Sequence, residues 1–162
     1  MTTTAIRQGG PKREFDLVLD FVKMLHRRLM EMEPISSADL RDCNYACVYV
    51  FSEAEEHLYV GRSRRVRERI LQHSRPSSQD APFAFRLARE KAGMMKPSYQ
   101  KIGSRQYLRT HPQFKAAFLE AKERIRKMKV RCVHVDDATT QALLEIYTST
   151  VLDARYNEFK TT

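Results

Sequence analysis

The sequence has no tryptophan, few cysteines and no long hydrophobic run. Its three cysteines, Cys43, Cys47 and Cys132, form no Cys-x-x-Cys pair and have no histidine at zinc-finger spacing, so neither a disulfide framework nor a zinc site is predicted. We expect three reduced thiols. No apolar run approaches the roughly 20 residues that span a bilayer, and residues 1–13 lack the apolar stretch of a signal peptide. We therefore expect a cytoplasmic protein that has no membrane partner.

The length and composition are those of one globular domain with an appended helix. The chain has 162 residues, of which 42% are hydrophobic and 30% charged, which argues against a disordered or membrane-embedded chain. A chain of this size buries on the order of 70% of its unfolded surface, so its core needs no disulfide or metal. Two full catalytic domains do not fit this length.

Positive charge is concentrated in the middle of the chain. Residues 46–129 carry 19 basic and eight acidic residues, whereas basic and acidic residues are nearly balanced on either side of them. Residues 62–109 alone hold 13 basic residues, mostly arginine, and three acidic ones. The planar arginine fork suits phosphate oxygens. This distribution favours a polyanionic partner, and a solvated basic face is the alternative.

Three segments follow from the composition and the apolar spacing. Residues 1–13 have no apolar periodicity and are predicted to be a flexible tail. Residues 14–45 form an N-terminal helix and a connector, because apolar residues from Phe15 to Met32 recur at alternating spacings of three and four. That helix either packs on the main domain or pairs with a second copy as a homodimer. Residues 46–162 form the main domain, with a basic helical and loop insertion at about 74–129.

The main domain is predicted to be α+β, with a small antiparallel or mixed sheet. Residues 46–51 and 58–60 are β-branched and aromatic and predict a hairpin, with 52–57 as its connection. A third strand is expected at 130–135. Helices are expected at 64–72, 83–92, 112–128 and 138–152, the last capped by Asp136 or Asp137. The excursion at 93–103 is expected to have little regular structure.

Two groups of residues in the first half of this domain are candidates for chemistry. Tyr49 and Tyr59 lie on the two predicted strands and are expected to face each other across the ladder, roughly 5 Å apart, with simple packing as the alternative. Arg65, Arg69 and His73 are four residues apart, so a helix would place them along one side. Because like charges at that spacing repel, an anion between them is the economical explanation, and phosphate is the expected one.

Glu145 is a third candidate, because it lies among apolar residues of the last predicted helix. Burying an unpaired carboxylate costs several kcal/mol. The spacing leaves open a structural pair with an arginine, a metal ligand, or a place on the solvated edge of the helix.

These residues occur in the order and at spacings that resemble the GIY-YIG nuclease pattern. The resemblance covers about residues 46–159 and departs from the pattern where Val48 and Val60 stand for isoleucines and Cys47 for the first glycine. The elements that carry it are Val48-Tyr49-Val50, Leu58-Tyr59-Val60-Gly61-Arg62-Ser63, Arg69, His73, Glu145 and Tyr156-Asn157.

The resemblance implies phosphodiester hydrolysis on a three-stranded antiparallel sheet flanked by helices. It implies that Glu145 holds one divalent metal and that Arg69 stabilises charge on the scissile phosphate. Tyr49 would help take a proton from the attacking water, and Tyr59 and His73 would orient that water, with His73 as a proton acceptor near neutral pH. Arg62 would contact phosphate, and Asn157 would support the site.

A single metal also agrees with the distribution of carboxylates. Two-metal sites need several converging carboxylates, whereas Glu145 stands alone in its helix, so Mg²⁺ or Mn²⁺ with bound waters is expected. The predicted function is therefore a metal-dependent DNA endonuclease, with RNA also open as a substrate. The alternatives are a non-cleaving or partner-dependent nucleic-acid-binding module of the same fold, and an interaction protein built around the N-terminal helix. The exposed arginines expected to bind nucleic acid, beside Arg62, are Arg64, Arg65 and Arg67.

Overall fold

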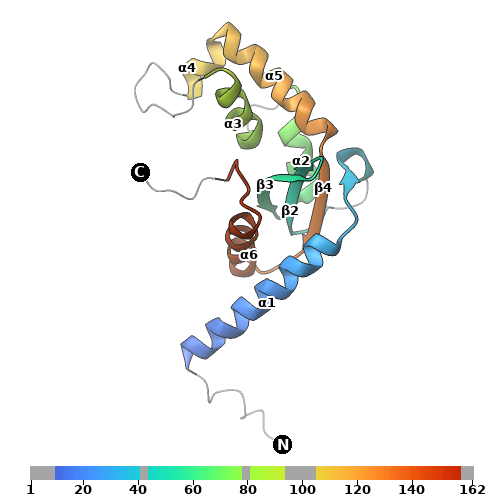
Figure 1. Cartoon of the computed structure of the whole chain (residues 1–162), viewed down its shortest axis with the longest axis vertical. Coiled ribbons are helices and arrows are strands. Elements are labelled where there is room, and N and C mark those ends of the chain that lie inside the picture. The colour runs from blue at the N-terminus through green and yellow to red at the C-terminus, as the bar shows by residue number, and fades with distance from the viewer. Residues whose placement is uncertain (1–9, 41–43, 78–80, 94–104, 158–162) are drawn as a thin grey trace, which may run out of the picture.

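The computed structural model describes residues 10–40, 44–77, 81–93 and 105–157. They form an α+β domain with one antiparallel sheet between two layers of helices (Figure 1). The elements, in chain order, are α1 (Pro11–Glu31), β1 (Ile35–Ser36), η1 (Ser37–Asp39), β2 (Cys47–Glu53), β3 (Glu56–Ser63), α2 (Val66–Ser74), α3 (Pro82–Lys91), α4 (Arg105–Thr110), α5 (Pro112–Lys127), β4 (Lys129–His134) and α6 (Ala138–Val151).

The sheet has four strands in the order β1-β4-β2-β3, and every neighbouring pair is antiparallel. The prediction of three strands was therefore wrong by one, although the antiparallel arrangement is confirmed. The additional strand is β1, where Ile35 pairs with Val130 and Ser36 with Lys129. Two residues after Pro34 are too short to show the alternation by which strands are recognised.

The hairpin of β2 and β3 is longer and tighter than predicted. The segment expected to be a loop, residues 52–57, mostly belongs to the strands, because Ser52 pairs with His57 and Glu53 with Glu56. Only Ala54 and Glu55 make the turn, with Ala54 at a φ of 51°. The Ser52 hydroxyl and His57 Nδ1 are 2.8 Å apart, which ties the two strands together across this polar end.

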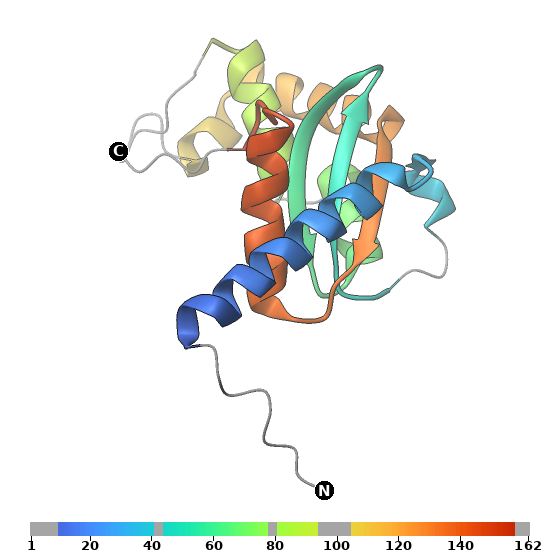
Figure 2. The same cartoon turned by 60° about the horizontal axis from the view of Figure 1, so that its bottom comes forward.

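Each face of the sheet is covered by a different set of helices. Tyr49, Phe51 and Tyr59 lie on one face and belong to a core that includes residues of α2, α3 and α5. Val48, Val50 and Val60 lie on the other face and pack with α1 and α6, which cross in front of the sheet in Figure 2. The edge strand β3 therefore runs between α6 on one side and α2 with α3 on the other.

The N-terminal helix packs on the main domain through its C-terminal half. Val22, Leu25 and Leu29 are buried against the valine face of the sheet. Phe15 and Met32, which were predicted to continue the stripe, remain 50% and 41% exposed. The helix begins at Pro11, so the predicted tail 1–13 was too long by three residues; residues 1–9 lie outside the described part.

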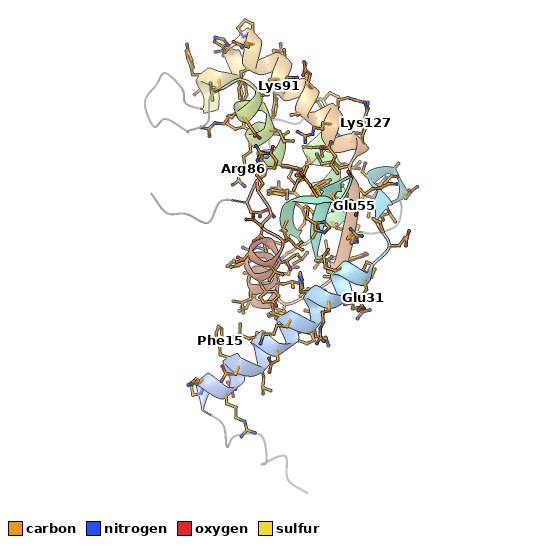
Figure 3. The ribbon with its side chains drawn as sticks, in the orientation of Figure 1. Phe15, Glu31, Glu55, Arg86, Lys91 and Lys127 are labelled. Atoms are coloured by element: carbon orange, nitrogen blue, oxygen red, sulfur yellow. The ribbon has the colours of Figure 1, made fainter. Side chains whose placement is uncertain are left out.

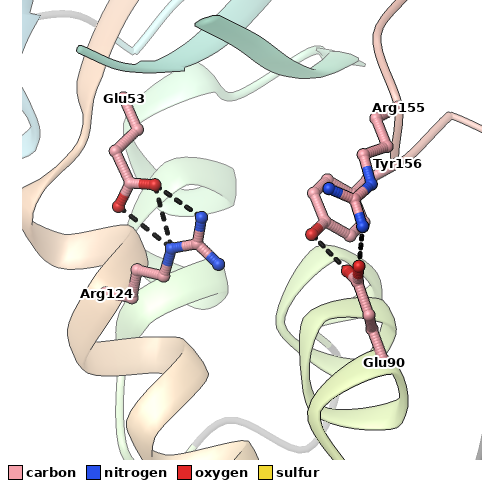
Figure 4. A network of polar contacts seen from close by, with 5 residues as sticks. All are labelled: Glu53, Glu90, Arg124, Arg155 and Tyr156. Atoms are coloured by element: carbon pink, nitrogen blue, oxygen red, sulfur yellow. Dashed lines mark hydrogen bonds and ion pairs between the residues drawn. The ribbon is translucent and has the colours of Figure 1, made fainter. Parts of the chain in front are cut away.

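The helical insertion is fastened to the rest of the domain by ion pairs at two points. Arg124 of α5 donates to both carboxylate oxygens of Glu53 at the end of β2 (Figure 4), with an Nε–Oε1 distance of 2.9 Å. Glu90 of α3 accepts hydrogen bonds from the Tyr156 hydroxyl and from Arg155 in the C-terminal segment. These contacts hold α3 and α5 beside the sheet.

Most predicted helices are confirmed, with ends shifted by one or two residues. Asp137, one of the two predicted caps, accepts a hydrogen bond from the Thr140 backbone N–H at 2.7 Å. The helix α4 was not predicted; most of the expected excursion at 93–103 lies outside the described residues, as does Cys43. Cys47 and Cys132 are buried, and neither forms a disulfide with another described residue. No described helix has the length and apolar character needed to cross a bilayer.

Candidate active site at the edge of the sheet

A β-bulge brings the two candidate tyrosines to the same face of the sheet. Ser52 pairs with His57, but Phe51 pairs with Tyr59, so Leu58 of β3 is the additional residue. Because side chains alternate along a strand, this insertion turns Tyr59 to the face that carries Tyr49. The tyrosines were predicted to be opposite each other, and this was wrong: Tyr49 is paired with Gly61, two positions further along β3.

Tyr49 is buried and its hydroxyl is held by His73. The side chain is 1% exposed, and its Oη lies 2.9 Å from Nε2 of His73 at the end of α2. Burial and the neighbouring Tyr59 raise the pKa of Tyr49 well above its usual value, while Arg69 acts to lower it. At neutral pH the phenol is therefore protonated, and Arg69 is the nearby charge that favours its ionised form.

His73 is a core residue of α2. It is fully buried, and burial, together with the charge of Arg69, lowers the pKa of the imidazole to about 3. At pH 7 His73 is therefore neutral, and its lowered pKa makes it a weak base, which argues against the role of proton acceptor near neutral pH that the resemblance implies. Among the described residues its Nδ1 has no hydrogen-bond partner, so the contact with Tyr49 is its polar anchor.

The predicted row of Arg65, Arg69 and His73 along one side of the helix does not form, because His73 is buried in the core. Arg65 is exposed at the start of α2, where its Nη1 is 3.5 Å from Glu68 Oε2. The side chain of His73, in contrast, is completely buried. Val66, Ile70 and His73 are instead the buried positions of the helix. Their spacing of four and three is that of a core-facing stripe, a signal that was present in the sequence.

Tyr59 packs in an aromatic cluster with His73 and Phe83. Its ring stacks on Phe83 of α3 with centroids 4.7 Å apart, and its centroid is 5.5 Å from that of His73. The side chain is 8% exposed, and burial raises the pKa of its hydroxyl. The charges of Arg86 and Arg69 act to lower this pKa, and the charge of Glu145 acts to raise it. Tyr59 therefore contacts the buried aromatic cluster and is also close to the charged groups of the site.

Glu145 is partly buried and paired with Arg62. Arg62 Nε donates to Glu145 Oε2 at 2.9 Å, and the glutamate side chain is 20% exposed. Of the three readings of Glu145 from the sequence, the pair with an arginine is the one present in this structure. Burial nevertheless raises the pKa of Glu145, against the lowering effect of Arg62, Arg69 and Arg86.

Arg86 is the site residue that the sequence reasoning missed. It lies on α3, within the insertion (Figure 3). Its Nη1 donates to the Tyr156 carbonyl oxygen. Its charge acts on both Glu145 and Tyr59. No motif marks it, because its closeness to Glu145 depends on how α3 docks beside β3.

Asn157 closes the exposed edge of β3. Its Oδ1 accepts from the Val60 N–H at 2.8 Å, and its Nδ2 donates to the Val60 carbonyl at 2.7 Å. The Tyr156 N–H donates to the carbonyl of the bulged Leu58 at 3.1 Å. These bonds fix the backbone between Tyr59 and Gly61, which is the supporting role expected of Asn157.

A shallow hollow opens beside these residues on the surface of α2. It has a volume of about 260 Å³ and is lined by Ser63, Arg64, Arg65, Glu68, Arg69 and Gln72. Arg69, whose Nη1 is 3.3 Å from Gln72 Oε1, is partly buried at its inner side, while Arg67 is exposed elsewhere on the helix. Arg64 and Arg65 thus lead from solvent toward Arg69, but Arg67 does not line the hollow.

Glu145 is the carboxylate that the described part of the site offers to a metal ion. No group of three or more histidine, cysteine, aspartate or glutamate side chains comes together within the described residues. Glu145 is accessible and fits a hard cation that keeps most of its waters. Glu145 Oε2 accepts from Arg62, so a cation would bind through Oε1 or would displace Arg62 from Oε2.

Comparisons of the chain with family models, with curated proteins and with solved structures found no match.

Proposed function

We propose that this chain is an endonuclease of the GIY-YIG type that hydrolyses phosphodiester bonds in DNA with the help of one divalent cation, Mg²⁺ or Mn²⁺. The observation that supports the proposal is that the predicted site residues from four separate elements come together in the folded chain. Tyr49, Tyr59, Arg69, His73 and Glu145 come from β2, β3, α2 and α6, and they interact around one point at the edge of β3.

The arginines provide the first requirement, which is binding of a phosphate. Arg69 and Arg86 come from different helices and both act on Glu145, so a phosphate between them would meet two cationic groups. The hollow lined by Arg64 and Arg65 continues this positive surface. Guanidinium groups held in place before the reaction stabilise charge that develops on the phosphoryl oxygens. Arg69 acts on Tyr49, Tyr59 and Glu145, whereas Arg86 acts on Tyr59 and Glu145.

Tyr49 provides the group that takes a proton from the attacking water. In its phenolate form, Oη accepts that proton as the O–H bond of water breaks. Arg69 favours the phenolate by its charge, and His73 can donate to it from Nε2 over 2.9 Å. Because burial keeps the phenolate fraction small at neutral pH, we expect cleavage to be faster at alkaline pH.

Glu145 would hold the divalent cation, which neutralises charge on the phosphate and polarises it. Arg62, Arg69 and Arg86 favour the ionised carboxylate against the effect of burial, and Arg62, once displaced by the cation, would contact the nucleic-acid backbone. The buried cysteines Cys47 and Cys132, which form no disulfide among the described residues, suit a reducing compartment, and we accordingly propose a cytoplasmic location.

A second candidate function is a nucleic-acid-binding module that does not cleave, or cleaves only with a partner. The observation that favours it is the Arg62–Glu145 ion pair, which occupies the carboxylate that a metal needs. The two functions differ in the effect of one substitution. Glu145→Gln keeps the size and polarity of the side chain and removes its charge.

The experiment incubates linear, supercoiled and branched DNA with purified protein in Mg²⁺, Mn²⁺ or a chelator. Wild-type protein should cleave with metal alone, and Glu145→Gln should reduce cleavage to background. Glu68→Gln, which neutralises an exposed carboxylate of α2, should leave cleavage within about twofold. A DNA-binding isotherm in chelator should be retained in all three proteins. Binding without cleavage by the wild type under every metal condition would favour the second candidate, and cleavage by Glu145→Gln would defeat the single-metal mechanism.

A further inference from the structure

The helix α1 carries a second apolar stripe that the domain does not cover. Val22, Leu25 and Leu29 face the sheet, but Leu17, Phe21 and Met24 are 64%, 48% and 42% exposed. The latter are spaced by four and three residues, so they follow one side of the helix. Figure 2 shows the N-terminal half of α1 running past α6 into open space. Clusters of large exposed apolar side chains of this kind mark interaction surfaces.

Charged residues border this stripe in a self-complementary order. At 100° per residue, with Phe21 at 0°, the stripe runs from about −60° to 0°. Glu14 at about 20° and Arg28 at about −20° lie on its Phe21 side, and Arg13 and Glu31, both at about −80°, lie beyond the other edge. All four are exposed, and no ion pair involving them occurs among the described residues. Along each edge, one charge sign stands near the N-terminal end of α1 and the opposite sign near its C-terminal end.

We propose that this stripe binds the same stripe of a second copy of the chain, with the two α1 helices antiparallel and related by a two-fold axis at Phe21. Glu14 is seven residues before Phe21 and Arg28 is seven residues after it, so the two-fold places Glu14 level with the partner's Arg28. Arg13 likewise comes within about 3 Å along the axis of the level of the partner's Glu31. Leu17 packs near the partner's Met24.

A second copy fits this surface better than other occupants. An antiparallel pair satisfies four charged residues of each helix at once and aligns the helix dipoles favourably. It also keeps the two domains apart, because each domain is attached to the C-terminal half of its own α1. Residues 1–9, the nearest segment of the same chain, contain only Met1 and Ile6 as large apolar side chains. The inference does not depend on the proposed function.

The first test is sedimentation velocity of the full chain over about 1 µM to 1 mM. A contact of about three helical turns per protomer lies at the small end of specific interfaces, so we expect a reversible dimer in the micromolar range. Phe21→Glu should abolish the dimer. Leu119→Glu, which changes an equally exposed residue of α5 (47%), should leave it intact. A wild-type protein that is monomeric throughout, or a dimer that survives Phe21→Glu, would overturn the proposal.

The second test fixes the direction of the helices by charge reversal. Glu14→Arg and Arg28→Glu should each weaken dimerisation about tenfold, because each puts two pairs of like charges in contact across the two-fold. The double variant Glu14→Arg/Arg28→Glu should restore the wild-type dissociation constant. Failure of the double variant to recover would exclude the antiparallel register. Since neither test measures cleavage, an inactive protein would leave the result unaffected.

Discussion

Gly61 leaves the space that the ring of Tyr49 occupies. The two residues are cross-strand partners, and a Cβ built on Gly61 would lie 2.4 Å from the Tyr49 hydroxyl oxygen and 2.5 Å from Cζ. Tyr49 is enclosed by the core and cannot give way without losing its contact with His73. The glycine is therefore required by space at the site, and its backbone does not have a positive φ.

Gly61→Ala is expected to lower both stability and activity. The added methyl group should displace Tyr49 Oη from His73 and cost about 1–3 kcal/mol, as overpacking of a well-packed core does. Urea denaturation and the cleavage rate measure the two effects. Gly10→Ala is the control, because nothing lies within 4 Å of a Cβ at Gly10. A stable and fully active Gly61→Ala protein would contradict the placement of Tyr49.

Asn157 is expected to matter through the backbone of Val60. Asn157→Ala removes both hydrogen bonds at the edge of β3, and leaving those backbone groups unpaired should cost about 1–3 kcal/mol. Asn157→Asp keeps the acceptor for the Val60 N–H but places a second acceptor against the Val60 carbonyl oxygen, so it should lose at least as much. Thermal melting of the three proteins gives the order, and wild-type stability of Asn157→Asp would show that the Val60 bonds are not the cause.

Arg69 and Arg67 offer a matched comparison on one helix. Arg69 is partly buried and acts on Tyr49, Tyr59 and Glu145, whereas Arg67 is exposed. Arg69→Ala should reduce turnover about 10²-fold with little change in DNA affinity, because a group aimed at transition-state charge acts differentially. Arg67→Ala should weaken binding modestly at low salt and leave turnover unchanged. Single-turnover rates and binding isotherms separate the two, and equal losses of both quantities in Arg69→Ala would make it a simple phosphate contact.

The sequence was sufficient to predict the helices α1, α2, α3, α5 and α6 and three of the strands from their apolar patterns, whereas the six-residue helix α4 was missed. It was also sufficient to choose Tyr49, Tyr59, Arg69 and Glu145, which the structure brings together. The two-residue strand β1 was missed because it has no period, and its pairing with β4 depends on where α1 ends.

Details that depend on tertiary packing were not predictable in the same way. The bulge at Leu58 decides which face Tyr59 occupies, and no residue type in that segment marks it. The charge of Arg86 affects the pKa of Glu145 because α3 docks against the C-terminal segment. The burial of His73 is different, since its spacing from Val66 and Ile70 already indicated the core-facing side of α2.

The phenol of Tyr49 makes the cleavage rate depend on pH. Burial raises its pKa well above 10, so each unit of pH above neutrality should increase the phenolate fraction tenfold. The cleavage rate should then rise with a slope near one and show no plateau below about pH 9. Rates measured from pH 6 to 9 with saturating DNA test this expectation. A plateau beginning near pH 6.5 would indicate a titrating imidazole in place of the phenol.

The low pKa of His73 should make folding stability depend on acid. The folded protein holds the imidazole neutral down to a pKa of about 3, against 6.5 for the unfolded chain. Between those values the unfolded state binds the additional proton, so stability is fully present above pH 6.5 and is lost as the pH falls toward 3, by about 1.4 kcal/mol per pH unit. His73→Gln keeps a polar partner for Tyr49 but cannot be protonated, so its stability should fall less steeply. Urea denaturation of both proteins at pH 7, 6, 5 and 4 gives the comparison, because carboxylates titrate alike in the two. Parallel stability profiles for the two proteins would show that His73 is accessible to protons in the folded state, and the buried contact with Tyr49 would then be wrong.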